Sequence, residues 1–214
     1  ESSGSVEDFL DNKLPFAANK MLNYIDERVK FLVEEAAFFK SSFLIKEGFI
    51  KKELFTGMFG MVGLAEAVNH LLNATEPKDR FGYGDEANEL GLKIVEKLNS
   101  IVTSYKSPYV GDAYKNSHVM HCQVGIDTDT GISPGCRIPV GEPEIFEHLL
   151  QSAPYHKYFF NGIGDIFVFE DTYKEHPEAI INVIDGAFKA GIRYISAYSG
   201  GCDVVRVTGY LVKK

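Results

Sequence analysis

Four side chains near the middle of the chain are of types that do chemistry in proteins. His118, His121 and Cys122 fall within five residues of one another, and Cys136 follows in a loop rich in proline and glycine. Histidine and cysteine are common zinc ligands, but this spacing matches no zinc motif, so we expect half-buried strand residues instead. A cysteine–histidine pair that acts as nucleophile and base is also compatible with the composition.

Glu66 and Asn69 are polar residues within an apolar segment that is expected to be a buried helix. Two interpretations stay open for them. Their side chains either point into a cavity or form hydrogen bonds with neighbouring groups. The second interpretation is favoured, because buried polar groups in proteins are almost always hydrogen bonded.

Gly209 interrupts an apolar run near the end of the chain, over residues 203–212. Val204, Val205 and Val207 predict a buried β-strand there. A glycine within a strand loses side-chain packing and costs backbone entropy, and it usually marks a bulge or a close approach by another backbone. The presence of glycine at position 209 therefore needs an explanation, and that explanation could be chemical.

Apolar periodicity predicts the elements that must position these residues. Residues 5–12 are expected to be a polar lead-in, and apolar side chains at three- and four-residue steps predict an amphipathic helix from Leu14 to Phe39. Glycine and proline positions bound the other elements. Helices are predicted over 64–72, 86–105, 143–151 and 176–190, and strands over 118–126, 166–169 and 192–198. This alternation, without a repeat or a linker, predicts a single α/β unit.

The composition is that of an ordinary globular protein, with 45% hydrophobic and 24% charged residues among 214. A net charge of −8 argues against a general nucleic-acid surface. No apolar run is long enough to cross a bilayer and the first residues do not resemble a signal peptide, so a cytoplasmic protein is expected. Three cysteines fit no disulfide framework, and reduced thiols are expected. The chain begins without Met, so we expect it to start partway through a longer protein.

The segment from Arg206 to Tyr210 resembles the Arg-Val-x-Gly-Tyr fingerprint that glycyl radical enzymes carry close to their carboxy terminus. The resemblance extends over further blocks, which are Phe43 to Ile50, Phe55 to Asn69, Asp127 to Gly135 and Gly162 to Phe167. Together they make nearly all of this chain similar to the carboxy-terminal part of the YjjI-type family. That family is a functionally uncharacterised branch of the glycyl radical enzymes.

The resemblance implies an α/β fold that is the carboxy-terminal portion of a glycyl radical enzyme β/α barrel, related to pyruvate formate-lyase and anaerobic ribonucleotide reductase. It implies that Gly209 stores a backbone radical within a radical loop over residues 199–214. Glycine suits this role because it has no side chain to oppose flattening of its α-carbon. The residues that would support the loop are Arg206, Val207, Thr208 and Tyr210.

The resemblance also implies how the radical is made and used. A separate activating enzyme, which uses S-adenosylmethionine and an iron–sulfur cluster, would install an oxygen-sensitive radical on this chain. The radical would then pass to a cysteine thiol, and the resulting thiyl radical would take hydrogen from a small-molecule substrate that the sequence does not identify. A homodimer is compatible with the resemblance, whereas nucleic acid, a membrane and a metal site within the chain are not expected.

The thiyl cysteine of the family lies far upstream of the glycine, and none of the three cysteines here matches it. Cys136 is the best internal candidate, and Cys122 and Cys202 are weaker ones, with Glu66 and His121 as candidate substrate contacts. We expect the thiyl cysteine to lie upstream of this chain, which alone would then be inactive. Two alternatives stay open, a free-standing spare subunit that repairs another enzyme and a non-catalytic α/β binding domain.

Overall fold

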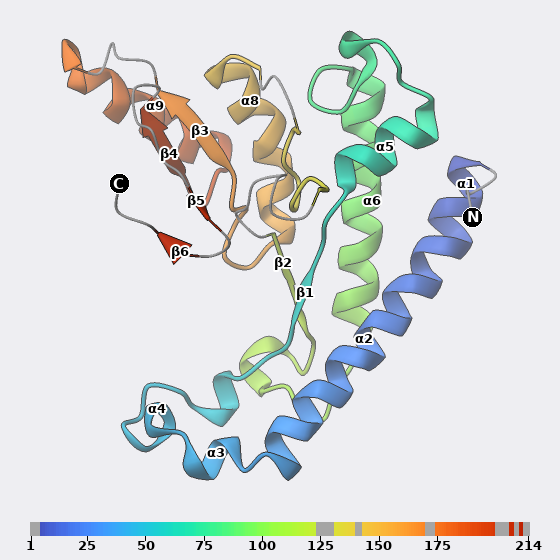
Figure 1. Cartoon of the computed structure of the whole chain (residues 1–214), viewed down its shortest axis with the longest axis vertical. Helices are drawn as coiled ribbons and strands as arrows, with labels where there is room; N and C mark the ends of the chain where they lie inside the picture. Colours follow the sequence, from blue (N-terminus) through green and yellow to red (C-terminus); the bar gives the residue numbers. More distant parts are fainter. Residues whose placement is uncertain are drawn as a thin grey trace.

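A long helical rod opens the chain in the computed structural model, which describes residues 5–122, 131–139, 143–169, 174–199, 206–207 and 210–211. Its segments follow one another without a break (Figure 1). They are α1 (Val6–Asp8), the π-helical turn η1 (Phe9–Lys13), α2 (Leu14–Lys30) and the π-helical turn η2 (Phe31–Glu35).

The rod agrees with the predicted amphipathic helix over most of its length and differs at both ends. The expected polar lead-in is wrong, because the Ser5 side chain accepts a hydrogen bond of 3.1 Å from the Asp8 amide and caps a helix that starts there. The far end stops at Glu35 instead of Phe39. The reason is Ala37, whose φ of 50° lies in the left-handed region that a helix cannot contain.

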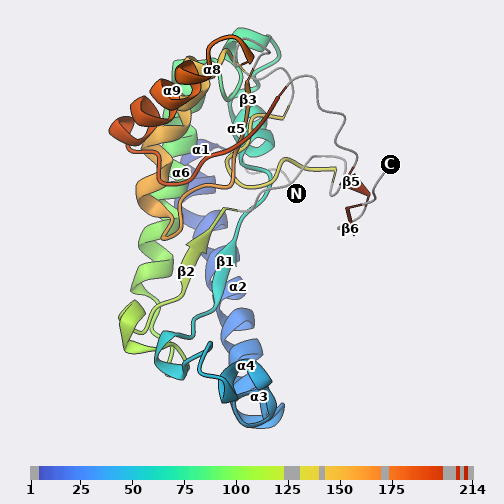
Figure 2. The same cartoon turned by 90° about the vertical axis from the view of Figure 1, so that its left-hand side faces the viewer.

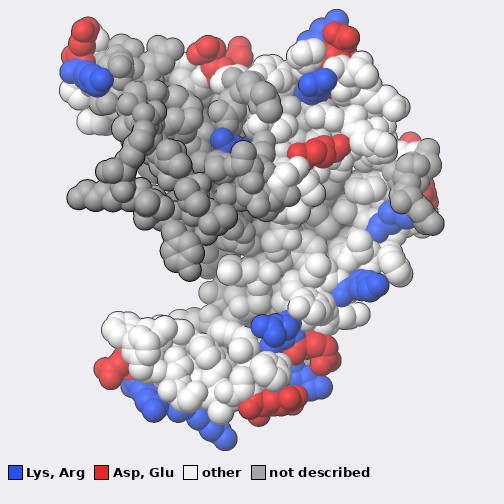
Figure 3. Space-filling view, in the orientation of Figure 1, with Lys and Arg blue, Asp and Glu red and all other residues white. Residues whose placement is uncertain are grey.

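Short helical pieces follow the rod at the lower end of the molecule in Figure 1. They are α3 (Phe38–Ser41), α4 (Phe43–Lys46) and η3 (Lys52–Leu54). Large apolar side chains are exposed here, including Phe43 at 69% and Phe49 at 76%. Figure 3 shows mainly uncharged surface at this lower end, with the charged side chains along its rim. A surface of this kind usually marks a contact with other protein.

The parallel strands β1 (Met58–Gly60) and β2 (Val119–His121) lie against the helices α2 and α6 (Asp85–Ser104), and α5 (Leu64–Leu72) packs on α6. The pairing register places Phe59 opposite Met120, and both side chains are buried in the larger core. The connection between the strands also contains the short turns η4 (Pro77–Asp79) and η5 (Asp112–Tyr114). The predicted helices over 64–72 and 86–105 are confirmed to within one residue.

A second parallel pair, β3 (Ile166–Phe169) with β4 (Ser196–Ser199), packs with α8 (Ile145–Ser152), η6 (Ala153–Tyr158) and α9 (Pro177–Ala190). An isolated parallel bridge between Cys122 and Ile163 connects this half to β2. Figure 2 shows α8 and α9 on one side of β3 and the short strands β5 (Arg206–Val207) and β6 (Tyr210–Leu211) on the other.

The α/β class is confirmed, but the described strands form separate two-stranded sheets and show no closed barrel. The predicted strand over 118–126 is described only up to Cys122, and the strand expected over 192–198 is observed at 196–199. A single strand over 203–212 is wrong, because β5 and β6 pair with each other in antiparallel orientation. None of the described helices has the length and apolarity needed to span a bilayer.

Candidate functional site

The loop that follows β2 crosses the carboxyl ends of β1 and β2. Its described part, residues 131–139, is held to the residues that follow β1 by backbone hydrogen bonds. The Gly63 amide donates to the Ser133 carbonyl over 2.8 Å, and the Gly135 amide donates to the Met61 carbonyl over 3.0 Å. Ligands of parallel sheets usually bind beyond the carboxyl ends of the strands. We therefore take this end as the candidate site.

Two thiols meet at this site. The Cys136 amide donates a hydrogen bond to the Cys122 sulfur over 3.2 Å, and each cysteine is only 3% exposed. Gly135 allows the loop backbone to lie this close to the Cys122 sulfur. Its φ of 56° is left-handed, and a β-carbon there would collide with that sulfur. Both cysteines are free thiols.

The pKa of the Cys136 thiol is raised well above its usual value. Burial is the main cause, and the hydrogen bond with the Cys122 thiol and the negative charge of Asp165 act in the same direction. Cys136 therefore keeps its S–H at neutral pH. A protonated thiol is a poor nucleophile and metal ligand, but it retains the hydrogen atom that radical chemistry requires.

Glu66 lies in the first turn of α5 and holds the same loop in place. Its Oε1 atom accepts hydrogen bonds from the Ser133 amide over 2.8 Å and from the Ser133 hydroxyl over 2.7 Å. Asn69, one turn later, accepts a hydrogen bond of 2.8 Å from the Phe81 amide. The interpretation that these polar side chains bond to neighbours is confirmed for both. Glu66 is a positioning residue in this geometry.

His121 is brought close to this end of β2 but lies on the other face of the strand from Met120 and Cys122. Met120 and Cys122 are buried, whereas His121 is half-buried, which follows from the two-residue alternation of a strand. His121 therefore does not share a face with Cys122. Among the described residues, no three His, Cys, Asp or Glu side chains converge as metal ligands would.

A buried hydrogen bond between His148 and Asp165 lies nearby and was missed by the sequence interpretation. The His148 Nε2 atom is 2.8 Å from Asp165 Oδ2, and each residue is 2% exposed. The other carboxylate oxygen accepts a hydrogen bond of 2.8 Å from the Ile166 amide. The signal in the sequence was an aspartate directly before an apolar strand, but nothing in the sequence links it to a histidine of α8.

His156 is a second missed histidine and is fully buried in η6. Its Nδ1 atom accepts hydrogen bonds from the Ile163 amide over 3.2 Å and the Arg193 amide over 3.1 Å. Burial, above all, lowers the pKa of His156 to about 4, so the ring is neutral at pH 7. Because Ile163 bridges to Cys122, this histidine fixes the segment that connects the thiol site to β3.

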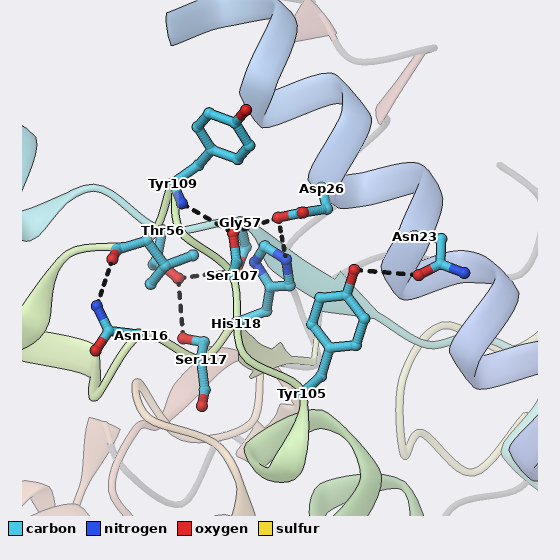
Figure 4. Close-up of polar contacts among 11 residues, drawn as sticks. Asn23, Asp26, Thr56, Gly57, Tyr105, Ser107, Tyr109, Asn116, Ser117 and His118 are labelled. Atoms are coloured by element: carbon cyan, nitrogen blue, oxygen red, sulfur yellow. Dashed lines mark hydrogen bonds and ion pairs between the residues drawn. The ribbon is translucent and has the colours of Figure 1, made fainter.

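The amino ends of β1 and β2 are closed by a different polar cluster (Figure 4). The Ser107 hydroxyl donates to the Asp26 carboxylate, and the same carboxylate oxygen lies 3.5 Å from His118 Nε2. The Tyr105 ring stacks on the His118 ring with 5.8 Å between centroids. Burial lowers the pKa of His118, and Asp26 opposes this shift. Gly57 packs so closely that a β-carbon there would lie 2.7 Å from the His118 ring.

Comparison with known proteins places the chain in a family. A family model described as glycyl radical enzyme YjjI-like matches residues 1–214. An uncharacterized protein of Haemophilus influenzae is 46% identical over 214 residues, and the uncharacterized protein YjjI of Escherichia coli is 42% identical over 214 residues. The chain belongs to the YjjI-like glycyl radical enzyme family.

Membership of the YjjI-like family confirms the resemblance that the sequence motifs indicated. The two relatives are matched over 98% and 100% of this chain but over only 41% of their own length. The chain thus spans less than half of the curated relatives that it matches. Both relatives are uncharacterized by name, so the family fixes the kind of protein and not its reaction.

The residues that the YjjI-like resemblance assigns to the radical loop lie at the end of the described chain. Arg206 and Val207 form β5, Tyr210 belongs to β6, and the register pairs Val207 with Tyr210. Thr208, Gly209 and Cys202 lie outside the described residues. The roles of these loop residues therefore stay predictions. The structure brings together Cys122, Cys136 and Glu66 from the remaining candidates.

Proposed function

We propose that this chain is the radical-storing part of an oxygen-sensitive glycyl radical enzyme, with the radical on the α-carbon of Gly209. Membership of the YjjI-like family, together with the Arg-Val-x-Gly-Tyr segment, carries this proposal. The antiparallel pairing of β5 with β6 supports it, because the two strands flank Thr208 and Gly209 in the sequence. A backbone radical at this position needs a residue without a β-carbon.

The proposed reaction moves one hydrogen atom at a time. The α-carbon radical of Gly209 takes a hydrogen atom from a cysteine S–H group, which restores glycine and leaves a thiyl radical. The thiyl radical takes a hydrogen atom from a C–H bond of a small-molecule substrate and later returns it. The radical is first installed by a separate activating enzyme that uses S-adenosylmethionine and an iron–sulfur cluster, which supply chemistry that amino-acid side chains lack.

We propose that the thiyl cysteine lies upstream, in the part of the enzyme that corresponds to the unmatched length of the relatives. In this account the chain is the carboxy-terminal part of a longer β/α barrel enzyme. The exposed apolar residues of the sheet face and of the lower end support an interface with further protein, since Met58 is 54% exposed and Val62 is 58% exposed.

Cys136 stays the internal candidate for the thiyl position. Its raised pKa supports it, because hydrogen-atom transfer needs a thiol that keeps its proton. Cys122, which contacts it, shares the same surroundings. Replacement of Cys136 by serine in the full-length protein should leave the radical on Gly209 intact whichever cysteine forms the thiyl radical, because the activating enzyme installs the radical on glycine. The later hydrogen transfer from substrate distinguishes the two cases, and it should persist in Cys136→Ser if the thiyl cysteine is upstream.

Electron paramagnetic resonance of the full-length protein after anaerobic activation tests the proposal. The wild-type protein should give an organic radical signal, and Gly209→Ala should give none. Gly186→Ala is the matched control, because a β-carbon at Gly186 in α9 meets nothing within 4 Å. A radical of undiminished yield in Gly209→Ala would remove Gly209 from its role.

A further inference from the structure

A pocket of about 390 Å³ opens near the amino end of β2, between the end of α6, the η5 turn and η6. This volume lies within the range of small-molecule sites in proteins. The pocket is distinct from the thiol site, because its lining along β2 ends at Met120 and includes none of Cys122, Cys136 and Glu66. Nothing in the proposed radical chemistry uses it.

Four basic residues line this pocket, which are Lys106, Lys115, Lys157 and Arg193, and no carboxylate is found among its described lining residues. Lys106 is already engaged. Its ammonium group donates to the Thr103 and Lys115 carbonyls over 3.2 and 3.1 Å and to the Ser117 hydroxyl over 2.7 Å. It therefore neutralises the carboxyl end of α6 and is not free to bind a ligand.

The other three cations form no ion pair within the described part of the chain. Lys115, Lys157 and Arg193 are all exposed, and no carboxylate lies within salt-bridge distance of their charged groups there. The whole chain carries a net charge of −8, so a cluster of three uncompensated cations stands out against an acidic background. Such a cluster attracts anions, and arginine and lysine are both common phosphate ligands in proteins.

Aromatic side chains form the wall beside these cations. The Tyr114 and Phe160 rings meet edge to face with 5.5 Å between centroids, and Phe160 is 63% exposed. The Lys157 ammonium lies 4.8 Å from the centroid of the Tyr158 ring, which holds this cation at the pocket. An exposed ring next to paired cations offers a flat surface on which a planar group can stack.

We propose that this pocket binds a phosphate-bearing small molecule with a planar ring, of the nucleotide class. Lys157 and Arg193 bind the phosphate, and Phe160 stacks on the ring. Arg193 is well placed for this, because its backbone amide is fixed by the hydrogen bond to buried His156. The proposal depends on neither Gly209 nor the thiols, so its test is independent of the radical chemistry.

Isothermal titration calorimetry of the full-length protein at low salt tests the pocket with three probes: adenosine monophosphate, inorganic pyrophosphate and adenosine. The monophosphate should bind most tightly, pyrophosphate less tightly and adenosine least, because only the first uses both halves of the pocket. Raising the salt concentration should weaken both anionic probes. No detectable binding of either anion at millimolar concentration would overturn the proposal.

Variants separate the two halves of the pocket. The double variant Lys157→Gln with Arg193→Gln should weaken both anions at least tenfold. Phe160→Ala should weaken the monophosphate about fivefold to tenfold, as loss of one stacking contact does, and change pyrophosphate by less than about twofold. All three side chains are exposed, so the variants should keep the wild-type circular dichroism spectrum.

The matched control is Lys93→Gln with Lys189→Gln, which removes the same charge from exposed salt bridges outside the pocket. It should leave all three affinities unchanged. An equal loss of affinity for the anions in this control would show that binding follows the net charge of the chain, and it would overturn the proposal. Equal affinities for the monophosphate and pyrophosphate, with no effect of Phe160→Ala, would overturn the nucleotide class. Binding only to an acidic protein, with no small-molecule binding, would identify a docking surface instead and also overturn the proposal.

Discussion

At the carboxyl ends of β1 and β2, two buried thiols and a carboxylate are held by a loop that returns from a distant part of the chain. At the amino ends, half-buried Asp26 contacts the buried Ser107 and His118 side chains, and the Tyr105 ring stacks on His118. The two ends differ in their chemistry. The thiol end keeps a hydrogen atom on sulfur, whereas the other end keeps a neutral histidine beside a carboxylate.

This difference separates a site that could exchange hydrogen atoms from one that fixes the fold. The thiol end depends on a left-handed glycine and on contacts between residues far apart in sequence. The amino end joins α2 to the residues around His118 through the hydrogen bond from Ser107 to Asp26 and the stacking of Tyr105 on His118. Substitutions at the two ends should therefore have distinct effects, which the following predictions rank from the largest to the smallest.

Gly135→Ala should destabilise the fold most. A β-carbon there collides with the Cys122 sulfur, and the left-handed backbone adds strain, so we expect a loss of about 4 kcal/mol in the free energy of unfolding. Gly131→Ala is the control, because Gly131 has a φ of 69° but open space around it, and it should cost only about 1 kcal/mol. Urea denaturation measures both, and equal losses would show that the thiol contact is not tight.

Acid should weaken the thiol end. The pKa of His156 is about 4 in the folded protein, against 6.5 for the free side chain. The unfolded chain therefore binds a proton first, so the stability from this residue is complete above pH 6.5 and is lost as the pH falls toward 4. This accounts for at most about 3 kcal/mol. His156→Asn, which retains an acceptor near Nδ1, should show a shallower stability loss between pH 6.5 and 4; an unchanged slope would contradict the assignment.

Gly57→Ala should test the amino end. The new β-carbon would lie 2.5 Å from an Ile25 methyl group and 2.7 Å from His118 Nδ1, which should cost about 2 kcal/mol through overpacking. Gly60→Ala in the same strand segment meets nothing within 4 Å and serves as the control. Thermal unfolding should show a lower Tm for Gly57→Ala only. A matching decrease in both variants would point to backbone entropy and not to the histidine contact.

Glu66→Gln should have the smallest effect. The amide keeps an acceptor for Ser133 but loses the charge that strengthens both hydrogen bonds, so we expect a loss of about 1 kcal/mol. Glu96→Gln on the exposed side of α6 should change stability by less than about 0.5 kcal/mol. Comparison of their urea midpoints measures the difference. No difference would mean that the loop does not depend on this carboxylate.

The sequence predicted the long elements well because their signals are local. The helices over 64–72, 86–105 and 176–190 show clear apolar periodicity, and the last of them ends at Gly191, whose φ of 107° only glycine adopts readily. The break at Ala37 carries no such signal, because alanine favours helix and its left-handed conformation is imposed by the surrounding structure.

The candidate site was predictable only in part. Cys122, Cys136 and Glu66 were chosen for their residue types, but their meeting depends on a loop that returns across two strands. The contact of His148 with Asp165 spans 17 residues and depends on how α8 packs on β3. The pocket with Lys157 and Arg193 likewise joins segments that no sequence spacing relates. Local patterns predict elements, whereas such sites arise from their packing.

The central claim is that the radical resides on a glycine α-carbon at position 209. The most direct measurement is electron paramagnetic resonance of the full-length activated protein, produced with unlabelled glycine or with glycine deuterated at the α-carbon. A glycyl radical retains one α-hydrogen, so the unlabelled signal should be split into two lines and the deuterated protein should lose that splitting. A spectrum unchanged by the label, or one that persists in Gly209→Ala, would contradict the account.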